Sequence, residues 1–212
     1  MDADTGARTA SENWLLLMDP VWQPVTDNDP PPTDAVVGLW PVEDHDRLGK
    51  FRANPDYRPS DEDSPTDPLD TVLRLVLMDR ATTVHIQLML RDAFFDIAVD
   101  ADGRPLVRTS PDDIPCVVLA TSEPHRARVT SPDWSRVDLI ELATLLADDI
   151  DVLINPGGPA EVRLTGDFIR ETVLLNDEDL RTATPDSGDT GGLRMARWEV
   201  PEDRAPGPKT GG

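Results

Sequence analysis

The side chains best suited to catalysis or metal binding are few and lie far apart in this 212-residue sequence. His45, His85 and His125 have no second Cys or His ligand two to four residues away, as structural zinc sites usually do. Cys116 is the only cysteine and lies within an apolar run, which favours a buried, inert thiol over a reactive one. His125 could serve catalysis with Cys116, or with Ser122 and an aspartate, only if the fold brought them together. We therefore predict no catalytic residue, no metal and no cofactor.

Motifs that bind nucleotides or cations are also absent from the sequence. No GxxxxGK[ST], GxGxxG or GxSxG run occurs, so there is no recognisable phosphate cradle or nucleophile elbow. Asp100 and Asp102 resemble the start of a calcium loop, but Gly103 comes two positions early and no glutamate follows where that loop needs one. We predict a hairpin turn there and a solvated linker at the acidic run 61–63.

Two short motifs at the ends of expected strands are the best candidates for a ligand site. TSE (121–123) ends one apolar run and NPG (155–157) ends another. Together they offer a hydroxyl, a carboxylate and backbone N–H groups, which could recognise a polar metabolite if both motifs border one pocket. The alternative is that NPG is only a turn that ends a strand. The candidate ligand residues are Thr121, Ser122, Glu123, Asn155, Pro156 and Gly157.

The chain is strongly acidic, with 41 Asp and Glu against 20 Lys and Arg and a formal net charge of −21 spread evenly along it. No cluster of basic residues could neutralise phosphates, so we predict no nucleic-acid partner and no contact with an anionic membrane surface. The charge fits simple solubility, and a basic protein partner is the alternative. No run approaches the roughly 20 apolar residues of a membrane span, and no secretory signal is visible at the start. We expect a cytoplasmic protein, where a single unpaired cysteine is typical.

The elements that position these motifs predict an α+β fold. Asp67 followed by proline is typical of a helix start, and apolar residues recur at helical spacing over 69–77. A capping box at Asp138 and a cap at Thr165 predict two more helices, and the run 84–90 fits a helix or a strand. The expected strands are 94–99, 105–109, 114–121, 152–154 and one around 162–164. We therefore expect a single mixed β-sheet covered by helices.

The segments before and after this core have a different composition. Residues 1–12 are small and polar, and the end of the chain is rich in Gly and Pro, which is typical of disordered tails. Tryptophan and proline are frequent between them and the core, where short apolar runs at 14–18, 36–42 and 48–51 predict strands. The expected organisation is a tail over 1–12, an N-terminal β-hairpin extension over 13–60, the α+β domain over 66–176 and a mostly disordered tail over 177–212.

The core resembles the SseB N-terminal domain family. The similar segments, in order, are LDTVLRLVL (69–77), FFDIAVDADGRPLVRT (94–109), VVLATSE (117–123) and DLIELATLLADDIDVLINPGG (138–158). The family has one strand that ends in Thr-Ser and an acid, here at 121–123, and another that ends in Asn-Pro-Gly, here at 155–157. This resemblance covers about half the chain and brings no catalytic residue with it.

The N-terminal part is similar to actinobacterial type VII secretion system-associated proteins, which join such a segment to an SseB-like domain. The similar segments are ENWLLLMDPVWQP (12–24), VVGLWPV (36–42) and FRANPDYRPSDEDSPTDPLDTVLRLV (51–76). The resemblance implies a cytoplasmic accessory protein, encoded with machinery that secretes small helical hairpins. No second SseB-type domain is visible, so a function tied to that domain is not expected here.

Three functions compete at this point. The first is a non-enzymatic adaptor that binds a type VII secretion component or substrate through an aromatic surface. Trp14, Trp22, Trp40 and Tyr57 are its candidate anchors, and the alternative for the tryptophans is a place in the core. The second is a regulatory domain that binds a small molecule at the two strand ends. The third is an enzyme, which needs a nucleophile and base that the sequence does not show.

Overall fold

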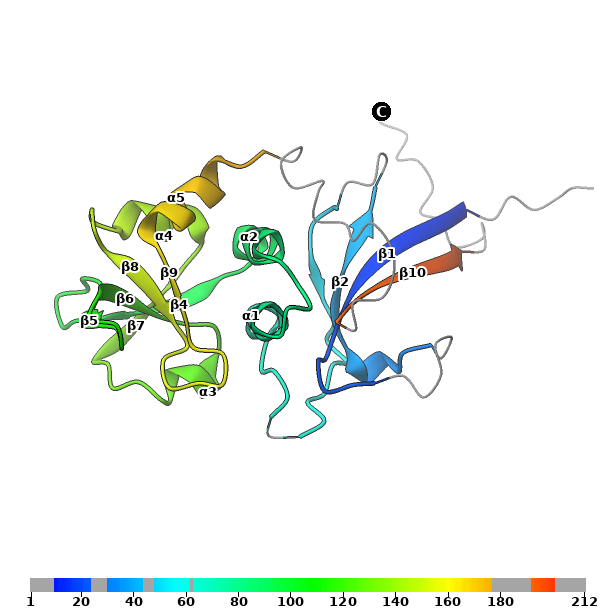
Figure 1. The fold of residues 1–212 in the computed structure, drawn as a ribbon, viewed down its shortest axis with the longest axis horizontal. Helices are drawn as coiled ribbons and strands as arrows, with labels where there is room; N and C mark the ends of the chain where they lie inside the picture. Colours follow the sequence, from blue (N-terminus) through cyan, green and yellow to red (C-terminus); the bar gives the residue numbers. More distant parts are fainter. Residues whose placement is uncertain (1–9, 24–29, 44–47, 62, 177–191, 201–212) are drawn as a thin grey trace, which may run out of the picture.

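Two β-sheets enclose a pair of helices in the computed structural model of the chain (Figure 1). The structure describes residues 10–23, 30–43, 48–61, 63–176 and 192–200. One sheet has four antiparallel strands and the other has six strands of mixed direction. The arrangement is an α+β fold, and both sheets contribute side chains to one continuous apolar core.

The four-stranded sheet joins the two ends of the described chain. Its order is β10-β1-β2-β3, in which every neighbouring pair is antiparallel. Its strands are β1 (Ala10–Met18), β2 (Val36–Val42), β3 (Arg52–Ala53) and β10 (Leu193–Val200). A short 3-10 helix (Thr33–Ala35) leads into β2.

The six-stranded sheet has the order β7-β4-β6-β8-β9, with β5 also paired to β6. Its strands are β4 (Phe95–Val99), β5 (Val107–Thr109), β6 (Pro115–Ala120), β7 (Asp133–Val137), β8 (Asp151–Ile154) and β9 (Val162–Leu164). Among the described strands of this sheet, β6 and β8 are the one parallel pair, and the long connection that such a pair needs passes through α3, β7 and α4. The carboxyl ends of β6 and β8 therefore meet at the same edge.

Local capping signals set where several helices begin. The Asp67 side chain accepts a hydrogen bond from the backbone N–H of Asp70 and starts α1, and Asp138 forms the expected capping box with Glu141. Thr165 caps the last helix in the same way. The helices are α1 (Pro68–Leu77), α2 (Thr83–Asp92), α3 (Glu123–Arg126), α4 (Leu139–Leu145) and α5 (Gly166–Leu174).

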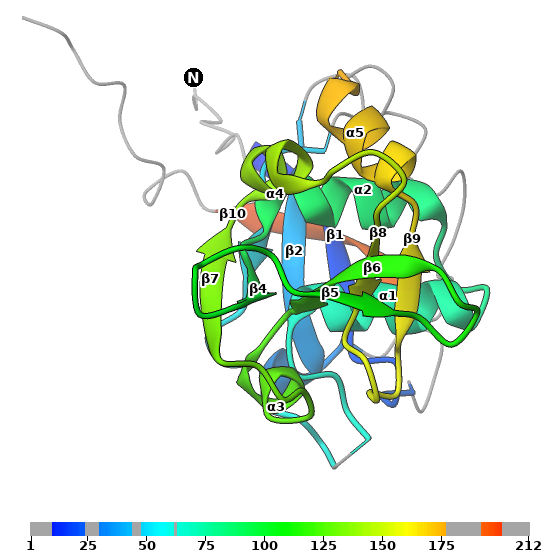
Figure 2. The same ribbon diagram turned by 90° about the vertical axis from the view of Figure 1, so that its left-hand side faces the viewer.

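Helices α1 and α2 lie between the two sheets, so the N-terminal segment packs on the rest of the chain (Figures 1 and 2). Alternation along β1 directs Leu15 and Leu17 to this interior, where they join the fully buried Leu73 of α1. The residue before β10 also packs tightly against α1, because a Cβ added to Gly192 would be 2.2 Å from Leu75 Cδ2. Helices α4 and α5 lie at one end of the six-stranded sheet, and α3 lies at the other.

The structure corrects several expectations about the sheets. The core forms a single mixed sheet, as expected, but the N-terminal extension is not a simple hairpin, because its strands form a second, four-stranded sheet that includes β10. The 177–212 segment was expected to be mostly disordered, yet Leu193–Val200 pairs with β1 over eight residues. The run at 48–51 is not the main partner of β2, which pairs with Arg52–Ala53 and bridges only to Leu48. Leu77 was placed on the buried stripe of α1 and is 58% exposed, because the helix ends there.

Candidate functional site

The two strand-end motifs lie side by side, as the parallel pairing of β6 and β8 requires. The backbone N–H of Thr121 donates to Asn155 Oδ1 at 3.0 Å, and Asn155 Nδ2 donates to Thr121 Oγ1 at 3.0 Å. Asn155 is fully buried and has a left-handed backbone with φ of 51°, which asparagine tolerates better than most residues. NPG therefore ends its strand as a turn, and its asparagine ties that turn to β6.

Helix α1 is fastened to the same place through its capping residue. Thr121 Oγ1 donates to Asp67 Oδ2 at 2.6 Å, while the other carboxylate oxygen caps the helix. Thr66 Oγ1 and Ser122 Oγ lie 2.8 Å apart and add a second contact between the same segments. Helix α1 packs against the four-stranded sheet. Its N-terminus is thus hydrogen-bonded to the end of a strand of the six-stranded sheet.

A buried ion pair lies directly behind these contacts. Asp70 Oδ2 accepts from Arg74 Nη2 at 3.0 Å and Nε at 3.2 Å, and from the backbone N–H of Thr66 at 3.1 Å. The same oxygen lies 3.5 Å from His125 Nε2 of α3. Asp70 is fully buried and His125 is 1% exposed, and among the residues that the structure describes Asp70 Oδ1 and both ring nitrogens of His125 have no hydrogen-bond partner. We call Asp67, Asp70, Arg74, Thr121, His125 and Asn155 the polar cluster.

The two aspartates of the polar cluster are both buried, but their pKa values shift in opposite directions. Desolvation raises the pKa of Asp67, and the hydrogen bond from Thr121 only partly opposes it. Desolvation would also raise the pKa of Asp70, but the His125 ring and the Arg74 guanidinium outweigh it and hold that pKa below its ordinary value. Asp70 is thus an ionised partner of Arg74, as a buried charge pair requires.

The polar cluster joins chain segments and leaves little for a ligand to bind. Thr121 and Asn155 bond each other, and the Gly157 N–H donates to Glu161 Oε2 at 2.6 Å. Within the described residues the Ser122 hydroxyl contacts Thr66 and makes no hydrogen bond to His125, whereas catalysis needs a nucleophile bonded to its base. Of the remaining two candidates, Glu123 is exposed and Pro156 is half-buried. We therefore read the cluster as a structural junction.

Substitution of Asn155 tests this role. Asn155→Ala should lower the free energy of unfolding by about 2–4 kcal/mol, because it removes the bonds to Thr121 and places alanine in a left-handed conformation. Asn155→Gly loses the same bonds without the strain and should be about 1 kcal/mol more stable than the alanine variant. Urea denaturation measures both. Asp113→Ala is the matched control, since Asp113 is exposed and also left-handed, with φ of 64°. Surface substitutions usually change the free energy of unfolding by less than about 0.5 kcal/mol. If both Asn155 variants lost no more than that, the polar cluster would not act as a structural junction.

The four aromatic candidates separate into interior and surface residues. Trp40 is fully buried, 4.7 Å from Phe51 between ring centroids, so it is a core residue, as the alternative for the tryptophans held, and not a surface anchor. It pairs with Leu15, which faces α1 and α2, and register therefore points it inward. Tyr57 is half-buried, and its hydroxyl lies 3.0 Å from both Asp19 Oδ2 and the carbonyl oxygen of Pro65. Burial and the Asp19 carboxylate raise the pKa of Tyr57. The Tyr57 hydroxyl is thus hydrogen-bonded within the chain.

Trp14 and Trp22 belong to a separate apolar cluster on the opposite face of the four-stranded sheet. This face, which points away from α1 and α2, carries Leu16 and Met18 of β1 and Val36 of β2. The Arg52 guanidinium lies 5.4 Å from the centre of the Trp14 ring, and that of Arg194 lies 5.7 Å from the Trp22 ring. An arginine thus covers each tryptophan through a cation–π contact.

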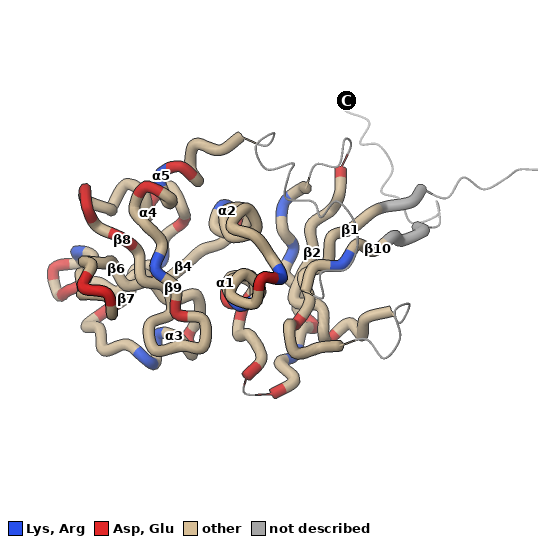
Figure 3. The backbone as a smooth tube through the Cα atoms, in the orientation of Figure 1, with Lys and Arg blue, Asp and Glu red and all other residues tan. Residues whose placement is uncertain are grey.

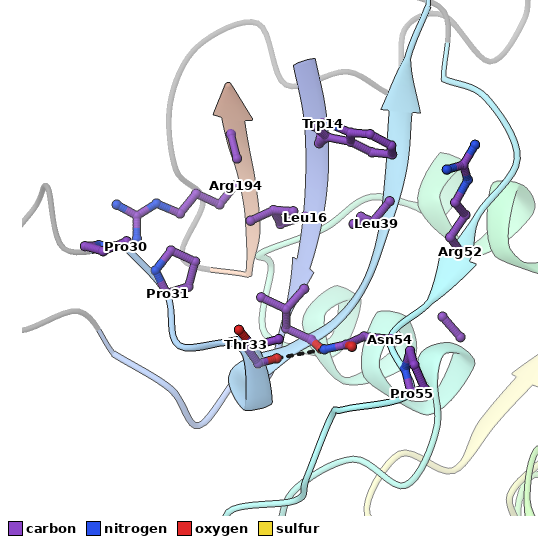
Figure 4. Close-up of a pocket in the computed structure, with 13 residues that line it drawn as sticks. Trp14, Leu16, Pro30, Pro31, Thr33, Leu39, Arg52, Asn54, Pro55 and Arg194 are labelled. Atoms are coloured by element: carbon purple, nitrogen blue, oxygen red, sulfur yellow. Dashed lines mark hydrogen bonds between the residues drawn. The ribbon is translucent and has the colours of Figure 1, made fainter. Parts of the chain in front are cut away.

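A groove of about 560 Å³ opens on this face (Figure 4). Its size is within the range of ligand-binding pockets. Leucine and tryptophan side chains make its floor, and prolines stand at its sides. We call it the outer groove, and its lining residues are Trp14, Leu16, Pro30, Pro31, Thr33, Val36, Leu39, Arg52, Ala53, Asn54, Pro55, Arg194 and Ala196. A second, smaller cavity of about 200 Å³ lies between α2, α4 and α5.

Only Trp14 among the outer-groove residues was a sequence candidate. Leu16, Leu39 and Arg194 come from three strands far apart in the sequence, and no local motif marks them. The alternation of Trp14, Leu16 and Met18 was a usable signal, because it gives β1 apolar residues on both faces. A strand that is apolar on both faces needs a cover on each side or an exposed binding surface.

Comparison of the chain with protein-family models, curated proteins and solved structures gave no match. No helix in the described part of the chain has both the length and the apolar character needed to cross a membrane. Within the same residues, no group of three or more His, Cys, Asp or Glu side chains is placed to hold a metal ion. Cys116 is buried in β6, and burial raises the pKa of its thiol. The outer groove is therefore the strongest candidate site.

Proposed function

We propose that this protein is a non-enzymatic, cytoplasmic accessory protein of a type VII secretion system, which binds a secretion component or substrate in the outer groove. The groove carries the proposal, because a large concave apolar surface on a sheet face is typical of a binding site. Its floor comes from segments 12–24 and 36–42, which are among those similar to type VII secretion system-associated proteins. An adaptor role needs such a surface and no catalytic group.

The contrast with the polar cluster supports binding at the groove. Thr121 and Asn155 make their hydrogen bonds to each other and to Asp67. In the outer groove, by contrast, exposed Thr33, Ala53 and Pro55 border apolar side chains at an open surface. Binding a protein there would cover apolar area that now faces water, which is the main driving force of association.

Site-specific photo-crosslinking in a lysate of the native host tests the proposal. A benzophenone amino acid is placed at Thr33 or Pro55, both exposed at the groove, and at Ile140, which is 64% exposed on α4. We expect the groove positions, and not position 140, to crosslink a protein that mass spectrometry identifies as a type VII secretion component or substrate.

A blocking variant shows whether the groove itself is responsible. Ala53→Trp places a large side chain at the groove and should reduce the crosslinked product by roughly tenfold, the loss expected for one blocked central contact. Ala127→Trp is the matched control at the exposed position that directly follows α3. Absence of a crosslinked secretion protein, or equal yields with both tryptophan variants, would rule the proposal out.

A further inference from the structure

The outer edge of β7 is a strand edge that the described part of the fold leaves open. Strand β7 forms one side of the six-stranded sheet and pairs with β4, and no other described strand pairs with it (Figure 2). Asp133, Ser135 and Arg136 of this strand are exposed. The strand at the opposite side of the sheet, β9, has three residues, whereas β7 has five. An exposed strand edge is a template for pairing with another chain.

Hydrogen bonds of β4 show which backbone groups of β7 face this open edge. The carbonyl oxygen of Ala98 accepts from the N–H of Leu106 at 2.8 Å, so the backbone of Ala98 is bonded on the side of β4 away from β7. Ala98 and Trp134 therefore form a non-hydrogen-bonded pair, and the backbone groups of Trp134 and Arg136 point outward. In agreement with this direction, the Trp134 N–H donates to Asp133 Oδ1 at 2.8 Å.

The residues along this edge are complementary to those of a second copy of the chain. If β7 pairs antiparallel with β7 of a second copy and Ser135 lies at the centre, Trp134 of each copy lies opposite Arg136 of the other. The outward backbone groups of these residues then meet, and each Trp134–Arg136 pair exchanges N–H···O bonds in both directions. The Trp134 N–H exchanges the exposed Asp133 carboxylate for a backbone carbonyl.

The side chain of Arg136 is already placed for this contact. Its guanidinium lies over the face of Phe94, 5.5 Å from the ring centre, and Phe94 is 58% exposed. Alternation along β4 and β7 puts Phe94, Trp134 and Arg136 on the same face of the sheet. Trp134 of the second copy, opposite Arg136, would place each guanidinium between two aromatic rings. Cation–π contacts with both rings would stabilise the pairing.

The local charge permits this contact, although copies of a chain with a net charge of −21 repel one another. Strand β7 has one acidic and one basic residue, Asp133 and Arg136, and is therefore neutral. Figure 3 shows acidic and basic residues interspersed around β6 and β7. At physiological salt, charges farther apart than about 8 Å are largely screened, so the acidic residues elsewhere on the surface do not prevent a close contact here.

We propose that two copies of this chain associate through the outer edges of β7, antiparallel and centred on Ser135, so that their six-stranded sheets become one continuous sheet about a two-fold axis. Trp134 and Arg136 supply both the backbone hydrogen bonds and the contacts between guanidinium and aromatic rings. The association does not involve the outer groove and is independent of the proposed function. Because a five-residue strand makes a small interface, the dimer should be weak, with a dissociation constant of roughly 10–100 µM.

Sedimentation velocity of the full chain tests the association. Over about 2 to 200 µM protein, which spans the expected dissociation constant, we expect a reversible shift from monomer to dimer. Arg136→Glu should raise the dissociation constant roughly tenfold, because it removes the guanidinium that faces Trp134 of the second copy and adds a carboxylate. Arg52→Glu is the matched control and should leave the constant unchanged. Arg52 also lies over an aromatic ring, that of Trp14 at 5.4 Å, but on the edge of the other sheet.

Disulfide trapping tests the register and leaves Arg136 in place. In the proposed pairing, Ser135 lies opposite Ser135 of the second copy in a non-hydrogen-bonded pair, with Cα atoms about 4.5 Å apart, which is within the range of a disulfide. Ser135→Cys should therefore form an intermolecular disulfide under mild oxidation. Asp133→Cys is the matched control, since the two Cα atoms at that position would be about 14 Å apart. The native Cys116 is buried and does not compete.

Three results overturn the inference. They are a chain that stays monomeric over the whole concentration range, equal effects of Arg136→Glu and Arg52→Glu on the dissociation constant, and a disulfide that forms as readily in Asp133→Cys as in Ser135→Cys. None of these results changes what is crosslinked at the outer groove, so the proposed function and this inference fail separately.

Discussion

Asp70→Ala should lower the free energy of unfolding by about 3–5 kcal/mol, which is the usual loss when one partner of a buried ion pair is removed. Arg74 is 7% exposed and would keep its charge without the carboxylate that accepts two of its hydrogen bonds. The backbone N–H of Thr66 would lose its acceptor as well. Because these groups are buried at the start of α1, which packs in the common core, the loss should appear in global unfolding, measured with urea.

A double variant separates the ion pair from the packing around it. Asp70→Leu/Arg74→Met removes both charges while keeping most of the volume, and it should be clearly more stable than Asp70→Ala. An Asp70→Ala variant within about 1 kcal/mol of the parent, a change typical of average substitutions, would show that the buried pair contributes little to the stability of the fold.

The dependence of stability on pH provides an independent check. The pKa of Asp70 is lowered by folding, so its contribution is present above the unfolded value of about 3.9 and is lost as pH falls through the folded pKa. The pKa of Asp67 is raised, so its contribution declines as pH rises from that same unfolded value toward the folded pKa. Asp67→Asn keeps a capping side chain and should therefore gain stability relative to the parent as pH rises above about 4.

Local sequence signals accounted for much of the helices and for the turn at NPG that ends β8. Asp67, Asp138 and Thr165 were each predicted to start a helix and each caps one, because capping depends on residues within one turn. The meeting of Thr121 with Asn155 follows from two parallel neighbouring strands. Their bonding to Asp67 did not follow, since no sequence rule placed the start of α1 at that edge.

The second sheet and the outer groove depend on contacts between distant segments. Leu193–Val200 pairs with Ala10–Met18, and although this short run stands out from the polar, Gly-rich sequence before it, no local signal identifies its distant partner. The outer groove exists only because three strand pairs have a particular register. A side chain's face cannot be assigned before its strand has a partner, which is why the sequence left Trp40 open between a surface anchor and a core residue.

Trp40→Ala should lower the free energy of unfolding by about 3–5 kcal/mol, as removal of a fully buried aromatic side chain usually does. Trp40→Phe should lose far less, since it keeps an aromatic ring against Phe51 and removes an indole N–H that has no hydrogen-bond partner. Trp14→Ala, on the outer face, should cost about 1 kcal/mol and act mainly on photo-crosslinking at the groove.

Measured together by urea denaturation and photo-crosslinking, these three variants distinguish the two faces of one sheet. Trp40 pairs with Leu15 toward the interior, whereas Trp14 pairs with Ala196 and lines the groove. If Trp40→Ala left stability unchanged and lowered the crosslinking yield more than Trp14→Ala did, the register of β1 and β2 would have to differ by one residue. Such a shift would exchange the faces of every side chain on the strand and place the outer groove against α1. The folding core and the proposed binding surface therefore depend on the same strand register.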